Sequence, residues 1–180
     1  MRLTKMHGLG NDYLYARPER DRDWTEFSRL ISDRHHGVGA DGFILALPST
    51  IADLRMRIFN ADGSEAEMCG NGIRCLARYA VEEGMVDSGA ESVSVETLAG
   101  TMTLALFREG EVVTSARVDM GRPSFEPASL PADLSGPGPI FDHPLNVGGM
   151  DLRLSFVSIG NPHAVHYVES GVDEFPLERI

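Results

Sequence analysis

The stretch with the clearest chemical potential surrounds Cys69, which is followed directly by Gly70, Asn71 and Gly72. A helix is predicted to begin here, and the first backbone N–H groups of a helix lack partners within it. These N–H groups and the positive end of the helix dipole favour the anionic form of a thiol. The same N–H groups can bind a carboxylate, and glycines permit a close approach of the ligand. One short element could therefore supply both a reactive base and a binding place for an amino-acid carboxylate.

A structural interpretation of Cys69 competes with this chemical one, because cysteine is often a small buried apolar residue. The Gly-Asn-Gly sequence and the helix start make the two interpretations about equally strong on physical grounds. For Cys75, further along the predicted helix, we expect simple packing in the core. The chain has no other cysteine, so neither a disulfide framework nor a zinc pattern is indicated. Because Lys5 is the only lysine and lies in a predicted strand, a pyridoxal phosphate Schiff base is also disfavoured.

Three further polar residues stand at predicted turns and strand ends. Asn11 and Asn60 lie where a side-chain amide could bind an ammonium or carboxylate group. An asparagine at a turn more often bonds its own backbone, so this alternative stays open for both. His163 follows a Gly-Asn-Pro sequence and could set the protonation state of a nearby thiol, or make an ordinary hydrogen bond at a strand end. The glycines between residues 37 and 42 lack the spacing of a dinucleotide-binding fingerprint.

Apolar periodicity predicts the elements that would position these residues. Asp23 can cap a first helix, whose apolar face would hold Trp24, Phe27, Leu30 and Ile31. A second helix is predicted over about 70–83, with a glycine just beyond its end. Strands are predicted over 3–7, 43–47, 54–59, 92–97, 101–107, 111–120, 152–159 and 163–168. The three strands between 92 and 120 are typical of an antiparallel meander, and 121–149 is predicted to be an irregular connection.

Composition and charge limit the classes of function. The chain has 180 residues, 42% of them hydrophobic and 24% charged, which suffices for one core or for one domain and part of another. A formal net charge of −11 repels nucleic acid and anionic lipid, so we expect no nucleic acid and no membrane as partner. No apolar run approaches the length of a membrane span, and the first residues lack a secretory signal, so we expect a cytoplasmic location.

Five segments, in order along nearly the whole chain, give the sequence a strong resemblance to the diaminopimelate epimerase family. They are 5–12 (KMHGLGND), 34–42 (RHHGVGADG), 60–75 (NADGSEAEMCGNGIRC), 119–123 (DMGRP) and 160–163 (GNPH). The resemblance implies an α+β fold of two pseudo-symmetric domains, each a curled, mostly antiparallel sheet around a central helix, with the substrate in the cleft between them. The corresponding division places the first epimerase domain at 1–117 and the start of a second, incomplete one at 118–180.

The resemblance also implies an activity and a set of site residues. Family members convert LL-diaminopimelate to the meso form for lysine and peptidoglycan synthesis, without metal or cofactor, by an acid/base mechanism with two thiols. By motif position, Cys69 is similar to the first catalytic cysteine and His163 to a histidine that tunes the thiols. The substrate-binding positions are matched by Asn11, Asn60, Gly70, Asn71 and Asn161. We expect diaminopimelate as the small-molecule partner and a homodimer of the full-length protein.

The sequence departs from the family pattern in two places. Gly42 stands where some members carry a glutamine that contacts the substrate. The second catalytic cysteine, which family members carry in an Ala-Cys-Gly-Thr-Gly motif, has no counterpart before Ile180. Inversion at the α-carbon needs a base on one face and an acid on the other, and Cys75 is predicted to lie on the same helix as Cys69. We therefore expect a fragment of a longer gene product that is inactive alone.

Three other functions stay open at this point. A proline racemase-like isomerase or a phenazine-pathway isomerase would share the fold, although the latter lacks the catalytic cysteine pair, so Cys69 argues against it. A non-catalytic fragment that binds carboxylates is an alternative from another class. A cysteine hydrolase would need a base and an oxyanion hole around Cys69 and would form an acyl intermediate.

Overall fold

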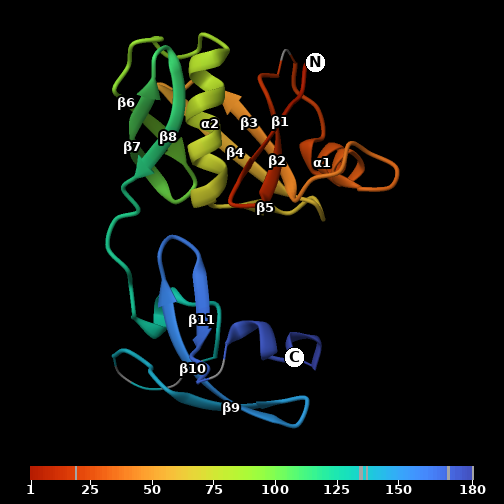
Figure 1. Cartoon of the computed structure of the whole chain (residues 1–180), viewed down its shortest axis with the longest axis vertical. Coiled ribbons are helices and arrows are strands. Elements are labelled where there is room, and N and C mark those ends of the chain that lie inside the picture. The colour runs from red at the N-terminus through yellow and green to blue at the C-terminus, as the bar shows by residue number, and fades with distance from the viewer. Residues whose placement is uncertain (19, 134–135, 137, 170, 180) are drawn as a thin grey trace. The chain divides into compact units, whose positions relative to one another are not determined.

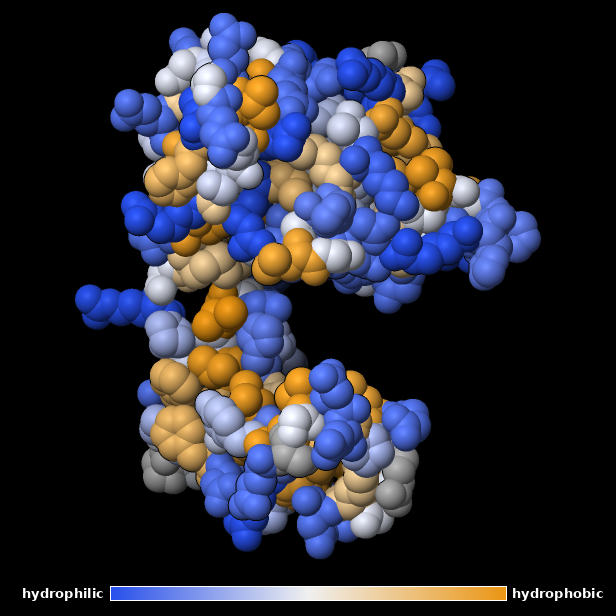
Figure 2. Space-filling model, in the orientation of Figure 1, coloured by the Kyte–Doolittle hydropathy of each residue, from blue (hydrophilic) through white to orange (hydrophobic). Residues whose placement is uncertain are grey.

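The computed structural model describes residues 1–18, 20–133, 136, 138–169 and 171–179 (Figure 1). The chain folds as two compact units, Met1–Met120 and Gly121–Ile180. Each unit has its own sheet. Hydrophilic residues cover most of the visible face of both units, with apolar residues scattered between them (Figure 2).

The first unit is an eight-stranded sheet that curls around one helix, α2 (Figure 1). In chain order its elements are β1 (Thr4–Gly8), β2 (Asn11–Ala16), α1 (Trp24–Ser32), β3 (Gly42–Leu47), β4 (Leu54–Asn60), β5 (Glu65–Ala66), α2 (Gly70–Glu82), β6 (Ser92–Thr97), β7 (Gly100–Glu109) and β8 (Val112–Val118). The strand order is β1-β2-β3-β4-β6-β7-β8, with β5 paired to β4. Neighbouring strands are antiparallel except for β2 with β3 and β4 with β6. This arrangement confirms the predicted fold class.

Helix α2 is the centre of the main core, and it contacts β1, β2, β3, β7 and β8. The fully buried residues of its apolar face are Ile73, Leu76, Ala77 and Ala80. Because burial of a leucine-sized side chain contributes about 1.5–3 kcal/mol, this face holds the helix firmly in the curled sheet. The helix ends at Glu82, and Gly84 just beyond it has a φ of 65°, so the predicted span and its glycine end are confirmed.

Helix α1 covers the opposite face of β2, β3 and β4, where Trp24 stacks on Phe43 with ring centroids 5.8 Å apart. Its predicted cap is confirmed, because the Asp23 carboxylate accepts a hydrogen bond from the Glu26 N–H at 3.1 Å. The aromatic packing and the cap together fix the start of the helix.

Leu30 of α1 is 60% exposed, so its predicted place on the packed face is wrong. Ser28 and Ser32 are buried instead. The Ser28 hydroxyl donates to the Asn60 carbonyl oxygen at 2.9 Å. The buried face of α1 therefore includes these two serines and not Leu30.

Strand β2 has no counterpart among the sequence predictions. Its residues Tyr13, Leu14, Tyr15 and Ala16 are all buried. Successive side chains enter the core around α2 and the core beneath α1 in turn. A strand that is buried on both faces lacks the polar alternation by which a half-buried strand is predicted.

The second unit contains a three-stranded antiparallel sheet in the order β11-β10-β9. Its strands are β9 (His143–Val147), β10 (Met150–Ser158) and β11 (Pro162–His166), and short 3-10 helices span Pro127–Ser129, Val172–Glu174 and Leu177–Arg179. The strand predicted over 152–159 is confirmed by β10. The prediction of an irregular connection over 121–149 is wrong where β9 forms. This edge strand is mostly exposed and carries Pro144, so neither burial nor alternation signals it.

Candidate active site

Cys69 occupies the N-cap of α2, with φ −139° and ψ 115°, as the sequence predicted for a thiol at a helix start. Its half-buried sulfur accepts a hydrogen bond from the Gly72 N–H at 3.4 Å. This contact satisfies one of the N–H groups that a helix leaves unpaired at its beginning. The thiol is therefore held at the positive end of the helix dipole.

The two glycines that flank Asn71 have different roles. A Cβ at Gly72 would lie 2.6 Å from the Cδ1 atom of Ile44, so the absence of a side chain lets the first turn of α2 pack directly on β3. The Tyr15 hydroxyl also donates to the Gly72 carbonyl at 3.0 Å. A Cβ at Gly70 would meet only the Met120 side chain at an ordinary 3.6 Å. Space thus demands glycine at position 72 and leaves position 70 open.

Asn11 is the predicted site residue that the structure brings directly to the thiol. The Cys69 S–H donates to the Asn11 Oδ1 atom with an Sγ–Oδ1 distance of 3.5 Å. Asn11 begins β2 after a tight turn in which Leu9 and Gly10 have φ values of 56° and 87°. Its Nδ2 group donates to the Asp41 Oδ2 atom at 2.7 Å.

Asn60 and Asn71 lie at the same end of the first unit, and both amides have local partners. Tyr13 of β2 pairs with Gly42 of β3, and Gly42 pairs with Asn60 of β4. The start of β2, the start of β3 and the end of β4 therefore lie at the same end of the sheet. The Asn60 Nδ2 group donates to the Ser64 Oγ atom at 2.9 Å, a contact between two side chains of the turn rather than the bond to its own backbone that the alternative interpretation expected. The Asn71 Oδ1 atom accepts from Arg74 of its own helix at 2.5 Å.

Gly42 has no room for any side chain. A Cβ there would lie 2.3 Å from the Phe59 carbonyl oxygen and 2.9 Å from Cε1 of Tyr13. A glutamine contact from this position is therefore absent from the described site. The Tyr13 ring lies in the space into which a side chain at position 42 would project.

Two tyrosines of β2 provide neutral hydroxyl groups beside the thiols. Burial raises the pKa of Tyr13, and the charge of Cys69 raises it further. Burial likewise raises the pKa of Tyr15, with a smaller contribution from Cys75. Both hydroxyls therefore keep their protons at neutral pH and contribute no negative charge next to Cys69.

Comparison with known proteins identifies the family. A family model described as diaminopimelate epimerase matches residues 3–126. The chain belongs to the diaminopimelate epimerase family. The curated diaminopimelate epimerases of Methanococcus maripaludis (strain C6) and Acetivibrio thermocellus are each 46% identical to it, over 182 and 183 residues. Each match covers 100% of this chain and 64% of the relative, so the chain spans less than two thirds of the length of these relatives.

Solved structures of other proteins share the fold of this epimerase-family chain at low sequence identity. A hydroxyproline epimerase from Agrobacterium vitis aligns with a TM-score of 0.63 and 19% identity, over 90% of this chain and 50% of that one. A PhzF-family phenazine biosynthesis protein from Bacillus anthracis aligns with a TM-score of 0.62 and 18% identity, over 94% of this chain and 57% of that one. At these identities the likeness concerns the fold alone.

The two remaining diaminopimelate epimerase motif residues lie together in the second unit. The His163 Nε2 atom is 3.0 Å from the Asn161 Oδ1 atom, and both residues are exposed. The ring nitrogen and the amide group are thus within hydrogen-bond distance of each other. The structure thus brings together Cys69 with Asn11, and separately His163 with Asn161.

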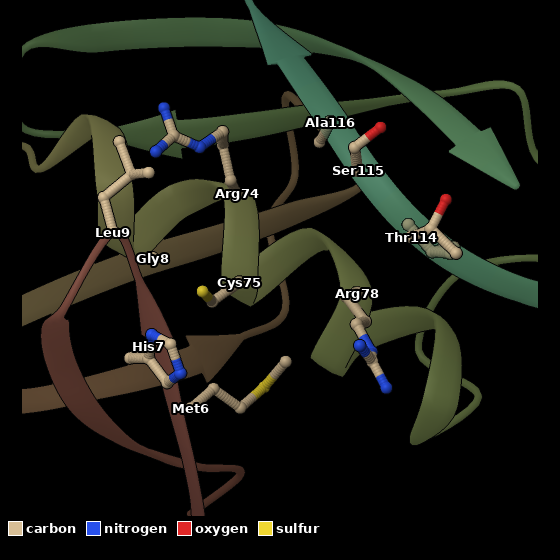
Figure 3. Close-up of a pocket in the computed structure, with 11 residues that line it drawn as sticks. Met6, His7, Gly8, Leu9, Arg74, Cys75, Arg78, Thr114, Ser115 and Ala116 are labelled. Atoms are coloured by element: carbon tan, nitrogen blue, oxygen red, sulfur yellow. The ribbon is translucent and has the colours of Figure 1, made fainter.

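Cys75 lies outside the site around Cys69. It is half-buried rather than enclosed in the core, so its predicted packing is only partly correct. Burial raises the pKa of the Cys75 thiol. Its side chain extends from α2 into a pocket of about 270 Å³, beside His7 of β1 and Arg78 of α2 (Figure 3).

Sequence reasoning missed an ion-pair network next to Asn11. Arg34 Nη2 donates to Asp12 and to Asp41, each at 2.7 Å, and Lys5 pairs with Asp12 at 3.0 Å. The hydrogen bond from Arg34 is the main reason why the pKa of Asp12 lies well below its usual range. All four residues fall within motif segments of the epimerase family, but their mutual contacts were not predicted.

Two structural findings concern the described part of the chain. Within it, no group of three or more histidine, cysteine, aspartate or glutamate side chains is arranged to hold a metal ion. Neither described helix of the α type combines the length and the apolar character needed to cross a membrane.

Proposed function

We propose that the full-length protein interconverts LL- and meso-diaminopimelate for lysine and peptidoglycan synthesis, with Cys69 as one of two acid/base thiols. The observation that carries this proposal is the thiol at the N-cap of α2 beside the Asn11 amide, in a chain that belongs to this family. We assign 1–117 to a first epimerase domain and 118–180 to the start of a second. We also propose a cytoplasmic homodimer.

The proposed reaction moves one proton off and one proton onto the α-carbon. The Cys69 thiolate takes the α-proton, and the electron pair of the broken C–H bond stays on the carbon. A second thiol then gives its proton to the opposite face, which inverts the centre, and the reverse reaction exchanges the two roles. Negative charge builds up next to the substrate carboxylate, so donors aimed at that carboxylate lower the barrier.

The first turn of α2 offers two such donors. The Gly72 N–H faces the Cys69 sulfur, and the Ile73 N–H donates to the Cys69 carbonyl at 2.9 Å. The N–H groups of Gly70 and Asn71 have no protein partner among the described residues. They are the groups with which a helix start binds an anion, and in our proposal they hold the reacting carboxylate. The site is completed in the proposal by the amides of Asn11, Asn60 and Asn161 as substrate contacts and by His163 as the residue that tunes the thiols.

The environment of Lys5 supports a mechanism without pyridoxal phosphate. The ammonium group donates to the Gly39 carbonyl at 2.6 Å and pairs with Asp12 at 3.0 Å. A charged ammonium that is held in an ion pair is not a nucleophile for a Schiff base. The thiol is thus the chemical group that the site presents to an α-proton.

The second thiol of the proposal does not come from Cys75. This residue lies on the same helix as Cys69 and lines a pocket that Cys69 does not line, and burial raises the pKa of its thiol. Acid and base must act on opposite faces of one carbon atom. We therefore assign the second thiol to a part of the full-length protein that has no counterpart in these 180 residues.

Stereochemical assay of the full-length protein tests the proposal. We expect Cys69→Ser to reduce interconversion of LL- and meso-diaminopimelate by about 10²–10⁴-fold, because an alcohol is a far weaker base than a thiolate. The matched control Cys75→Ser on the same helix is expected to stay within about twofold of the wild type. Full activity of the Cys69 variant would refute the assignment.

Two further measurements separate the alternatives. Interconversion of proline or hydroxyproline, without diaminopimelate, would favour a proline racemase-like isomerase, whose fold the chain shares. For the 180-residue chain we expect no net inversion. Calorimetry with diaminopimelate, together with deuterium exchange at its α-carbon, then distinguishes a carboxylate-binding fragment from one that retains half of the chemistry.

A further inference from the structure

The carboxylate of Asp41 faces the Asn11 amide on the side opposite the thiol. We propose that Asp41 is a positioning residue for Cys69, because it holds the Asn11 amide with its carbonyl oxygen turned toward the sulfur. The inference rests on the proposed acid/base role of Cys69. It deepens that role by naming a residue that controls which partner the sulfur meets.

The orientation of the Asn11 amide follows from the chemistry of its neighbour. A carboxylate only accepts hydrogen bonds, so the end of the amide that lies 2.7 Å from the Asp41 Oδ2 atom must be the NH2 group. The carbonyl oxygen therefore faces Cys69, with an Sγ–Oδ1 distance of 3.5 Å. Asp41 thus distinguishes the two ends of the amide, which are nearly the same in size and shape.

Asp41 is itself fixed at four points. Its Oδ1 atom accepts from Arg34 at 2.7 Å, and its Oδ2 atom also accepts from the Asp12 N–H at 2.9 Å. Its own N–H donates to the Asp12 carbonyl at 2.8 Å, and its carbonyl accepts from the Ala61 N–H at 3.1 Å. Each carboxylate oxygen thus has assigned partners, and rotation of the carboxylate would break bonds on both sides.

The glycine-rich loop between α1 and β3 brings Arg34 to Asp41. Gly39 has a φ of 79°, and a Cβ there would lie 2.9 Å from the Cα atom of Arg34. A Cβ at Gly37 would lie 2.5 Å from the Leu30 carbonyl oxygen. The glycines therefore let the loop fold back tightly on the end of α1. In this structure the loop positions a charged pair behind Asn11.

This arrangement gives the Cys69 sulfur a partner in each protonation state. The Gly72 N–H donates to it at 3.4 Å and suits the thiolate, whereas the Asn11 Oδ1 atom accepts from S–H and suits the thiol. The titratable groups that interact with Cys69 are Tyr13, Tyr15 and Cys75, and Asp41 lies behind the Asn11 amide. A reversed amide would direct an N–H group at the sulfur and hold it as the thiolate.

The pH dependence of alkylation tests the inference on the 180-residue chain. Iodoacetamide reacts with the thiolate, so the midpoint of the rate–pH profile reports the protonation of Cys69. Trypsin cleaves after Arg74, which places Cys69 and Cys75 on separate peptides and makes Cys75 an internal reference. Asp41→Ala leaves no side-chain acceptor for the Asn11 NH2 group. In this variant we expect the Cys69 midpoint to fall by about one pH unit or more, because the amide can turn a donor in place of an acceptor toward the sulfur.

Two sets of variants separate positioning from the loss of a charge. Asp12, like Asp41, is a carboxylate that pairs with Arg34, but its side chain makes no hydrogen bond to the Asn11 amide. Asp12→Asn therefore removes one negative charge without changing the partner of that amide, and we expect the Cys69 midpoint to stay within about 0.3 pH unit of the wild type. Asn11→Leu removes the amide altogether, so adding Asp41→Ala to it should produce no further shift. An equal shift in Asp12→Asn, or a shift that persists in the Asn11→Leu background, would overturn the inference, as would an unchanged midpoint in Asp41→Ala.

The alkylation profile does not depend on turnover, and a second variant tests the inference independently. Loss of epimerase activity in Cys69→Ser concerns the proposed function, whereas the alkylation profile depends only on what faces the sulfur. If Asp41→Ala does not fold, Asn11→Leu alone decides. It keeps the bonds of Asp41 to Arg34 and Asp12. Removal of the S–H acceptor should lower its midpoint, and an unchanged midpoint in this variant would contradict the inference.

Discussion

A methyl group added at position 42 tests how tightly β2, β3 and β4 pack at the end of the sheet that lies beside the thiol. In Gly42→Ala the new Cβ would lie 2.3 Å from the Phe59 carbonyl oxygen, 2.9 Å from Tyr13 Cε1 and 3.2 Å from Asn60 Cα. Two of these atoms are backbone of β4, which pairs in register with β3. Relief of the clash must therefore separate the two strands rather than rotate a side chain.

Insertion of one methylene-sized group into a packed core costs about 1–3 kcal/mol, and a clash with paired backbone places Gly42→Ala at the upper end, about 3 kcal/mol. For a unit of this size each kcal/mol lowers the melting temperature by roughly 4 °C, so we expect a fall of about 12 °C. Thermal and urea unfolding of the 180-residue chain, followed by circular dichroism, measures both quantities.

The matched control is Gly70→Ala, whose Cβ would meet only Met120 at 3.6 Å. We expect its free energy of unfolding to stay within about 0.5 kcal/mol of the wild type. If Gly42→Ala lowers the free energy of unfolding by less than about 1 kcal/mol, the strands β2, β3 and β4 pack less tightly around position 42 than the structure shows, and the reasoning about this position fails.

Two further predictions concern stability. Arg34 and Lys5 lower the pKa of Asp12, so the stabilisation that the Asp12 carboxylate provides is present above its unfolded pKa of about 3.9 and is lost as the pH falls below that value. The difference in urea midpoint between the wild type and Asp12→Asn should therefore shrink from pH 6 to pH 2. A difference that stays constant over this range would contradict the prediction. Asp23→Ala removes the cap of α1 and should cost about 1 kcal/mol, measured by urea unfolding, with no change as the contrary result.

Elements with a local signature were predictable from the sequence. The span of α2, its apolar face and Gly84 beyond its end follow from helical periodicity and cap chemistry. The meander of β6, β7 and β8 follows from short alternating runs divided by glycine turns. Both patterns depend on residues that are close in sequence, so they can be recognised from the sequence alone.

Elements whose signals come from the surrounding fold were missed. Strand β2 is buried on both faces, and β9 is an exposed edge strand, so neither shows the alternation of a half-buried strand. Leu30 occupies an apolar position by spacing, yet the docking of α1 through Ser28 leaves it exposed. In each case the neighbouring elements determine whether the residues are buried or exposed, and the local sequence pattern does not indicate which elements those are.

The sequence by itself determined that a thiol stands at the start of a helix, because the residues that begin α2 and the glycines around Asn71 are neighbours in the chain. Only the tertiary structure decided what that thiol faces. Asn11 is 58 residues from Cys69, and Asp41 is 30 residues from Asn11. Strand register and the fold of a glycine loop bring these groups together, and such long-range pairing depends on the packing of the whole sheet rather than on any local spacing.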